Sequence, residues 1–215
     1  MCENAFSNVL SMVFLCEQNP LRIVHILRAP MGGVLRHVRD LATAHAAQGH
    51  LVGIICDVPG TPGYNETILK ELQPQLALGL LRTPMSRAIG PSDILATVKI
   101  RHLIKNLKPD VVHGHGAKGG VYARFGGTLA TGNSYRPARI YSLHGGSLHY
   151  DPQSRNGKIY FQVERALERL TDYLIFVASF EHMTYEEKIS APSCPFEVIY
   201  NGLAEKEFDP VSPIR

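Results

Sequence analysis

Histidine and glycine residues follow three short apolar runs of the chain, in a pattern that could place an anion beside imidazole groups. The run RIVHIL leads to Met31-Gly32-Gly33, the run DVV leads to the histidines and glycines of residues 113–120, and the run RIYSL leads to His144-Gly145-Gly146. In an open α/β sheet, ligands bind beyond the carboxyl ends of the strands, where glycine lets backbone N–H groups approach an anion closely. The repetition therefore predicts one shared site that holds part of a phosphate-bearing ligand.

His144 is the residue in these turns that best suits a role in bond cleavage. A neutral histidine beyond the carboxyl end of a strand can donate a hydrogen bond to a bound sugar or stabilise charge as a bond breaks. The alternative is a structural histidine that caps a turn. His25 differs because it lies in the middle of a predicted strand, between Val24 and Ile26, and is expected to be a hydrogen-bonded core residue.

His113 and His115 are two residues apart, so they would face the same side of a continuing strand and could form a metal-binding pair. A catalytic metal needs a third nitrogen or carboxylate ligand, for which no clear pattern is present, and Lys118 adds a repelling charge. We therefore expect no metal and no cofactor. Imidazole N–H groups that donate to sugar hydroxyls or phosphate suit this segment better.

The first glycine turn lies between a strand and a helix, so the helix N-terminus would offer unpaired N–H groups to a diphosphate. A plain tight turn is the alternative. Asp57 stands roughly 20 residues further on, as the ribose-binding acid of a dinucleotide site would. However, Gly32 and Gly33 are adjacent and the third, helix-packing glycine is missing, so nicotinamide chemistry is the weaker interpretation. No pattern predicts a covalent nucleophile, and the simplest role for Ser179 is the N-cap of a helix.

Strand patterns alternate with helical patterns from residue 21 onward, which predicts a parallel sheet in a three-layer, doubly wound, Rossmann-like α/β fold. Helices are expected to begin at Gly33 and at Ser92, ending before Gly49 and Pro109, with a third over about 158–170. The strands are predicted near residues 22–28, 51–56, 76–82, 110–113, 139–143, 173–177 and 196–200.

The composition is that of one globular domain. The chain has 215 residues, of which 45% are hydrophobic and 19% charged, and a net charge of +3 that is too small to indicate nucleic-acid binding. Its four cysteines form no CxxC pair, so they are expected to be reduced thiols. Residues 1–20 are predicted to be a loosely ordered leader rather than a signal peptide, and residues 209–215 a linker.

Cations alternate with apolar residues along residues 99–108, where Lys99, Arg101, Lys105 and Lys108 flank isoleucines and leucines. This segment could lie on a membrane surface. A solvated helix packed on the sheet is the commoner outcome of such a pattern. We expect a cytoplasmic protein with a peripheral contact at the inner face of the membrane.

Several motifs, taken in order, resemble those of the N-terminal, acceptor-side domain of family 4 glycosyltransferases. They are ILRAPMGGVLRHVRDLA, GHLVGIICD, KPDVVHGHGAKGG, YSLHGGSLHYDP, TDYLIFVASFE and VIYNGLAEKEF, and the resemblance covers residues 21–208. It implies one half of a GT-B architecture. It also implies transfer of a sugar from a nucleotide-diphosphate donor to a glycan or lipid-linked acceptor, with retention of configuration and without a metal.

The same resemblance implies roles for individual residues. His144 approaches the transferred sugar, and Gly32 and Gly33 line the donor diphosphate together with the glycines of the third turn. The residues expected on the acceptor side or along the cleft are His113, His115, Lys118, His149, Ser179 and Asn201, and those expected against the donor diphosphate or sugar are Gly32, Gly33, Gly145 and Gly146.

The donor-binding domain of the family, with its nucleotide pocket, does not occur in these residues. The sequence is therefore expected to supply only half of the chemistry and to be inactive alone. It is either a fragment of a longer enzyme or one subunit of a split enzyme, whose partner would be a donor-domain polypeptide. Two alternatives stay open at this point. One is a non-catalytic binding subunit of a split glycosyltransferase, and the other is an NAD(P)-dependent oxidoreductase.

Overall fold

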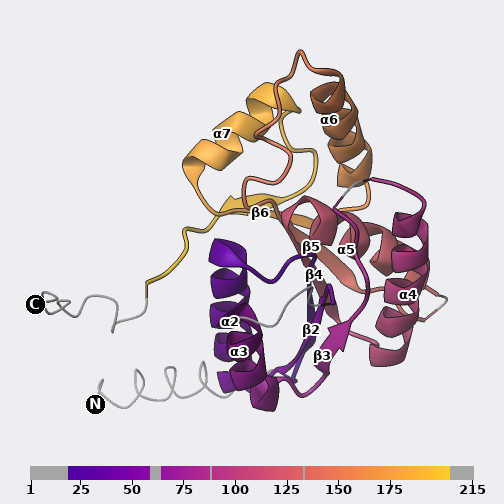
Figure 1. Ribbon diagram of the computed structural model, residues 1–215, viewed down its shortest axis with the longest axis vertical. Helices are drawn as coiled ribbons and strands as arrows, with labels where there is room; N and C mark the ends of the chain where they lie inside the picture. The colour runs from indigo at the N-terminus through magenta and orange to yellow at the C-terminus, as the bar shows by residue number, and fades with distance from the viewer. Residues whose placement is uncertain (1–18, 59–63, 88, 133, 204–215) are drawn as a thin grey trace, which may run out of the picture.

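The fold is a single parallel sheet covered by helices, as seen in a computed structural model that describes residues 19–58, 64–87, 89–132 and 134–203 (Figure 1). Seven strands lie in the order β3-β2-β1-β4-β5-β6-β7, and every pair of neighbours is parallel. The strands are β1 (Arg22–Leu27), β2 (Leu51–Cys56), β3 (Gly79–Arg82), β4 (Val111–His115), β5 (Ala138–Ser142), β6 (Tyr173–Phe176) and β7 (Phe196–Val198). The expected doubly wound α/β class is confirmed.

Helices connect the strands and cover both faces of the sheet. They are α2 (Gly32–Ala47), α3 (Tyr64–Leu72), α4 (Ser92–Leu107), α5 (Gly116–Ala130), α6 (Arg155–Glu168) and α7 (Ser179–Lys188), with a 3-10 turn at Gln73–Gln75. The apolar side chains of α2 and α3 pack on one face with Leu27 and Ile54. Those of α4 and α5 pack on the other face with Val24 and Ile26. A third cluster joins β5 and β6 to α6 and α7.

Local signals fix several helix ends as the sequence predicted. Helix α2 stops at its C-cap Gln48, and Gly49 follows with a φ of 86°, the left-handed conformation that glycine adopts at low cost. Helix α4 begins at Ser92, and Lys108 adopts a left-handed φ of 45° immediately before Pro109. The α6 N-cap is Ser154, whose hydroxyl accepts a hydrogen bond from the Gly157 N–H. The third helix therefore begins three residues earlier than expected.

Two expectations about the glycine and histidine segment were wrong. The strand predicted to end at residue 113 continues through His115, and Lys118, Gly119 and Gly120 lie inside α5 rather than in a turn. The reason is tertiary, because Gly119 and Gly120 of α5 lie against the β1 backbone and the Tyr141 ring of β5, where no Cβ fits. One further difference lies elsewhere in the chain. The strand predicted over 76–82 begins only at Gly79, since Leu76 is the C-cap of the preceding 3-10 turn.

The termini bear on two further expectations. Nearly all of the predicted leader, and all of the predicted linker at 209–215, lie outside the described residues. In the part of the chain that is described, every helix is too short or too polar to cross a membrane.

Candidate functional site

The strand order reverses between β1 and β4, and the helices that follow these two strands begin side by side at the carboxyl edge of the sheet. A reversal of this kind opens a crevice where ligands bind in doubly wound folds. Neither α2 nor α5 has a side-chain N-cap. Their first N–H groups therefore meet no capping side chain. Such uncapped N–H groups can bind an anion at a helix N-terminus.

Gly32 and Gly33 form the first turn of α2 at this crevice. Gly32 has a φ of 57°, a backbone conformation that favours glycine. A Cβ built on either residue would meet no atom within 4 Å, so the space beside both is open. The opening leaves room for a ligand to approach the backbone here, and the diphosphate expected at this turn stays a prediction.

Histidines gather beneath the crevice, on the face of the sheet that α2 covers. His25 and His113 are register partners on β1 and β4, and His115 lies two residues further along the same face. His37 and His45 of α2 pack against them, with the His25 and His45 rings stacked at 5.6 Å. The sequence predicted the His113 and His115 pair, but the fold adds the other histidines from elements distant in sequence.

Hydrogen bonds link these imidazoles into a chain. Nδ1 of His25 lies 3.0 Å from Nε2 of His115, and Nδ1 of His115 lies 3.1 Å from Nε2 of His144. His113 instead bonds to the Ser142 hydroxyl. His25 is fully buried as predicted, yet its Nε2 has no partner in the described structure, so it is only partly satisfied.

His144 connects this row of hydrogen-bonded imidazoles to the surface. It has a φ of 52°, and the only other described non-glycine residue with a positive φ is Lys108. Backbone in this region persists only where the surroundings hold it, and such positions concentrate at functional sites. Burial lowers the His144 pKa to about 4, with a further contribution from His37. The ring is therefore neutral at pH 7, as the sequence analysis required of it.

A pocket of about 590 Å³ lies beside His144, between the loop after β5 and the start of α7. The glycines of the third turn, Gly145 and Gly146, line it, and so does His149, whose Nδ1 bonds to the Gly146 carbonyl. Phe180 and Lys188 close its other side. The structure thus brings four of the predicted site residues to one pocket.

Glu181 holds this pocket together, although the sequence analysis did not single it out. Its carboxylate accepts hydrogen bonds from the N–H groups of Gly145, at 2.6 Å, and Val177, at 2.9 Å. Burial raises the Glu181 pKa. A glutamate in the first turn of a helix is the available signal, since such a side chain often reaches back to backbone N–H groups. The predicted N-cap Ser179 is instead the first residue of α7, after the N-cap Ala178.

Lys118, Ser179 and Asn201, which were also predicted, do not line this pocket. The Lys118 ammonium forms an ion pair with Asp93 of α4, at 2.6 Å. Asn201 is exposed, and its side chain lies near enough to His37 to act on the pKa of that ring, in the upward direction and against the larger lowering by burial. The Ser179 hydroxyl bonds to the Tyr200 hydroxyl. His37, which the sequence analysis did not consider, therefore places Asn201 near the histidine cluster.

A buried ion pair supports the loop that carries His144. Arg124 of α5 donates to Glu164 of α6 at 2.9 Å, and both side chains are almost fully buried. The second Glu164 oxygen accepts from the hydroxyls of Tyr141 and Ser147. Ser147 belongs to the loop after β5, so this network ties α5 and α6 to the loop that holds the catalytic candidate.

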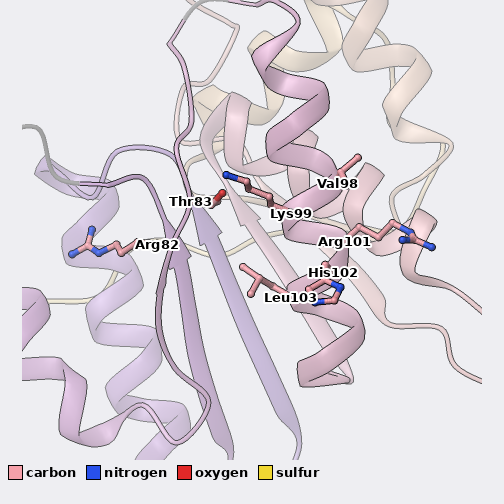
Figure 2. A pocket seen from close by; sticks show the side chains of 7 residues that line it. All are labelled: Arg82, Thr83, Val98, Lys99, Arg101, His102 and Leu103. Carbon is pink, nitrogen blue, oxygen red and sulfur yellow. The ribbon is translucent and has the colours of Figure 1, made fainter.

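A second pocket, of about 430 Å³, lies between the end of β3 and α4. Figure 2 shows the Lys99 side chain extending toward Thr83, whereas Arg82 turns away. The Arg82 guanidinium donates to the Glu66 carboxylate of α3. This pocket therefore borders the predicted membrane-facing segment and lies apart from the histidine cluster.

The predicted membrane-facing segment differs in one respect from expectation. Ile100 and Ile104 are buried in the core because they form the stripe of α4 that packs on the sheet. The exposed apolar residues of α4 come earlier, at Ile94, Leu95 and Val98. Lys99, Lys105 and Lys108 are exposed, but Arg101 is partly buried and donates to the Leu129 carbonyl.

Comparison with known proteins gives a consistent result. The sequence model of Glycosyltransferase Family 4 matches residues 31–206. The chain is 25% identical over 151 residues to EpsD of Bacillus subtilis (strain 168), which is named as a glycosyltransferase, and the match covers 70% of this chain and 38% of EpsD.

Solved structures show the same fold. A glycosyltransferase from Rickettsia africae ESF-5 matches with a TM-score of 0.61 at 24% identity, over 91% of this chain and 47% of the other. Anabaena HepE, solved in complex with UDP-glucose, matches with a TM-score of 0.60 at 17% identity, over 85% of this chain and 44% of HepE. The chain therefore spans less than half the length of these proteins.

Proposed function

The chain belongs to glycosyltransferase family 4, and from this premise we propose that it forms the acceptor-side wall of a cleft in which a sugar leaves a nucleotide diphosphate. The observation that carries the proposal is the placement of His144. This neutral histidine, held at positive φ, lies beside a pocket at the same sheet edge as two helix N-termini without side-chain caps. A donor and an acceptor could meet there.

Each group has a role in this proposal. The backbone N–H groups at Gly32 and Gly33 hold the donor diphosphate, and the turn of Gly145 and Gly146 lies near the sugar. His144 donates a hydrogen bond to the sugar and stabilises charge as the bond to the diphosphate breaks. His149, Ser179 and Asn201 face the acceptor, a glycan or a lipid-linked sugar. Since HepE was solved with UDP-glucose, a nucleotide sugar is the donor class to test first.

The second wall of the cleft belongs to a donor-binding domain in this proposal. Catalysis then needs both walls, because positioning and charge stabilisation come from groups on each side. We propose retention of configuration at the transferred sugar, and transfer without a metal. Histidine N–H groups and helix N-termini supply the positive potential that a metal would otherwise give.

A Gly33→Val variant should test the donor-binding role. The valine side chain would fill the open space beside the first turn of α2, so we expect the donor KM to rise at least ten-fold with little change in kcat. The assay uses the chain assembled with a donor domain. Because no atom lies within 4 Å of the added Cβ, the unfolding free energy of the chain should change by less than about 1 kcal/mol.

The matched control for this variant is Gly90→Val, at another glycine whose added Cβ meets nothing within 4 Å. Gly90 precedes α4 rather than α2, so the donor KM of the Gly90→Val assembly should equal that of the unaltered assembly. An unaltered donor KM in a folded Gly33→Val assembly would show that the diphosphate does not approach this turn.

The exposed face of α4 supports a peripheral membrane contact, which would suit a lipid-linked acceptor. Apolar Ile94, Leu95 and Val98 lie beside the exposed Lys99 and Lys105. Such a combination binds anionic lipid surfaces through its cations and buries its apolar side chains at the interface. Each cation near an anionic surface contributes about 1 kcal/mol.

Reversing the charges of Lys99, Lys105 and Lys108 to glutamate should weaken binding to vesicles that contain phosphatidylserine. The loss of three attractive cations predicts a fall of roughly 100-fold at low salt, measured by sedimentation. The matched control reverses Arg155 and Lys158 of α6 and its C-cap Arg169, which makes the same change in net charge. Equal partitioning of the α4 and α6 variants would contradict a specific contact through α4.

A further inference from the structure

We propose that His37, His115 and His144 form a binding site for one divalent transition-metal ion at the edge of the cleft. One nitrogen from each of these three residues lies within 4.8 Å of the other two. Zinc binds imidazole nitrogens at about 2.0–2.1 Å, which places two ligands of a tetrahedral ion roughly 3.4 Å apart. Nδ1 of His115 and Nε2 of His144 are already 3.1 Å apart. A small inward movement of His37 would complete the set.

The three ligands come from separate, well-supported elements. His37 lies on α2, His115 ends β4, and His144 follows β5. The other nitrogen of His115 bonds to His25, as metal-binding histidines usually bond to a second group that orients the ring. The third nitrogen was not expected from the sequence, because His37 is distant in sequence from the other two.

An unsatisfied atom points to a ligand at this place. Nε2 of His37 is buried and has no hydrogen-bond partner in the described structure, although buried polar atoms are nearly always paired. A metal ion held jointly with His115 and His144 would give this nitrogen a partner. No comparable need arises at an exposed histidine such as His102.

The charge around the cluster permits a cation. Burial lowers the pKa of His37, His115 and His144, so all three rings are neutral at pH 7 and have a lone pair to give. The charge of Lys118, expected from the sequence to repel a metal, is paired with the Asp93 carboxylate. Three imidazoles favour zinc, copper or nickel and disfavour magnesium or calcium, which prefer oxygen ligands.

The outer position of this set distinguishes it from a second trio, His25, His113 and His115. All three members of the inner trio are buried, and His113 is already bonded to Ser142. His37 and His144, by contrast, are partly exposed, and His144 lines the pocket. An ion can therefore reach the outer trio from the cleft, and its fourth coordination position can take water.

Occupation of this site has a consequence that rests on the proposed function. An ion bound to Nε2 of His144 would hold the ring toward His115 and away from a sugar. Zinc would then inhibit transfer, and a chelator would restore it. The binding experiment needs no transfer assay, so failure of the metal site and failure of the transferase proposal can be told apart.

The test is a titration of the 215-residue chain with Co²⁺, which reports tetrahedral coordination through its visible absorption, and with Zn²⁺ against a chromophoric chelator. We expect one ion per chain. His37→Gln should weaken binding by about 100-fold or more. Losing a group that merely hydrogen bonds to a metal ligand already lowers metal affinity by about 10–100-fold, and losing the ligand itself should lower it at least as much. His102→Gln, a surface change on α4, should leave the affinity unchanged. Mg²⁺ should not compete.

Two further measurements keep the proposal falsifiable if a variant folds poorly. In the unaltered chain, Zn²⁺ should shift the imidazole ¹⁵N signals of His37, His115 and His144. His113→Gln, which removes a ligand of the inner trio only, should retain binding. The proposal is overturned by the absence of saturable binding, by equal affinity in His37→Gln, or by loss of binding in a folded His113→Gln chain.

Discussion

A Gly119→Ala variant should lose more than about 3 kcal/mol of unfolding free energy, enough to leave much of the chain unfolded or insoluble. Gly119 lies in the first turns of α5, where the helix crosses β1. A Cβ built there would lie 2.4 Å from the Ile26 carbonyl oxygen and 3.1 Å from the Leu27 Cα. Both contacts are with backbone, so no side chain can rotate away, and α5 would have to move off the sheet.

Urea denaturation followed by circular dichroism measures this loss. Gly33→Ala is the matched control, since Gly33 is also helical but has no atom within 4 Å of an added Cβ. Because alanine favours helix over glycine, the control should be as stable as the unaltered chain or slightly more so. A Gly119→Ala chain that loses less than about 1 kcal/mol would contradict this close packing.

Replacing His144 by alanine should lower both kcat and kcat/KM by about 10²–10³ in an assembly that contains a donor domain. The reason is that His144 is proposed to stabilise charge mainly in the transition state. Its backbone has a φ of 52°, which alanine tolerates less well than histidine. His144→Asn is therefore the better variant for separating rate from stability, since asparagine tolerates this region and lacks the imidazole.

His144→Asn should show the same loss of rate as His144→Ala, with an unfolding free energy close to that of the unaltered chain. The control is His50→Asn, because His50 precedes β2 at the opposite edge of the sheet and its Nδ1 bonds only to the Leu21 N–H. A folded His144→Asn assembly with near-normal kcat would make His144 a structural residue. The family assignment would not change.

The glycines of α5 explain why local patterns misjudged one segment. Five glycines in 15 residues are typical of turns, because each costs up to about 1 kcal/mol in a helix. In the folded chain, Gly119 and Gly120 lie where a Cβ would meet β1 backbone or the Tyr141 ring. Close packing against the sheet outweighs the weak helix propensity. Tertiary contact therefore decided this element.

In the candidate site, too, local sequence groups some residues and only the packing of the helices brings in others. His144, Gly145, Gly146 and His149 follow one strand, so the rule that ligands bind at the carboxyl edge was enough to group them. His37 and Glu181 contribute from α2 and α7, and no spacing along the chain indicates that either reaches His144 or Gly145. Their roles depend on how the helices pack.

The sequence by itself determined the parallel α/β class and the starts of α2 and α4, and it grouped the candidate residues that follow β5. These follow from alternating apolar patterns, helix caps and glycine turns, all of which act over a few residues. Only the tertiary structure decided that α5 is a helix, that Lys118 pairs with Asp93, and that five histidines meet beneath His144. Each of these depends on contacts between residues far apart in sequence, and the free energy of such contacts exceeds local preference only once the sheet and its helices have assembled.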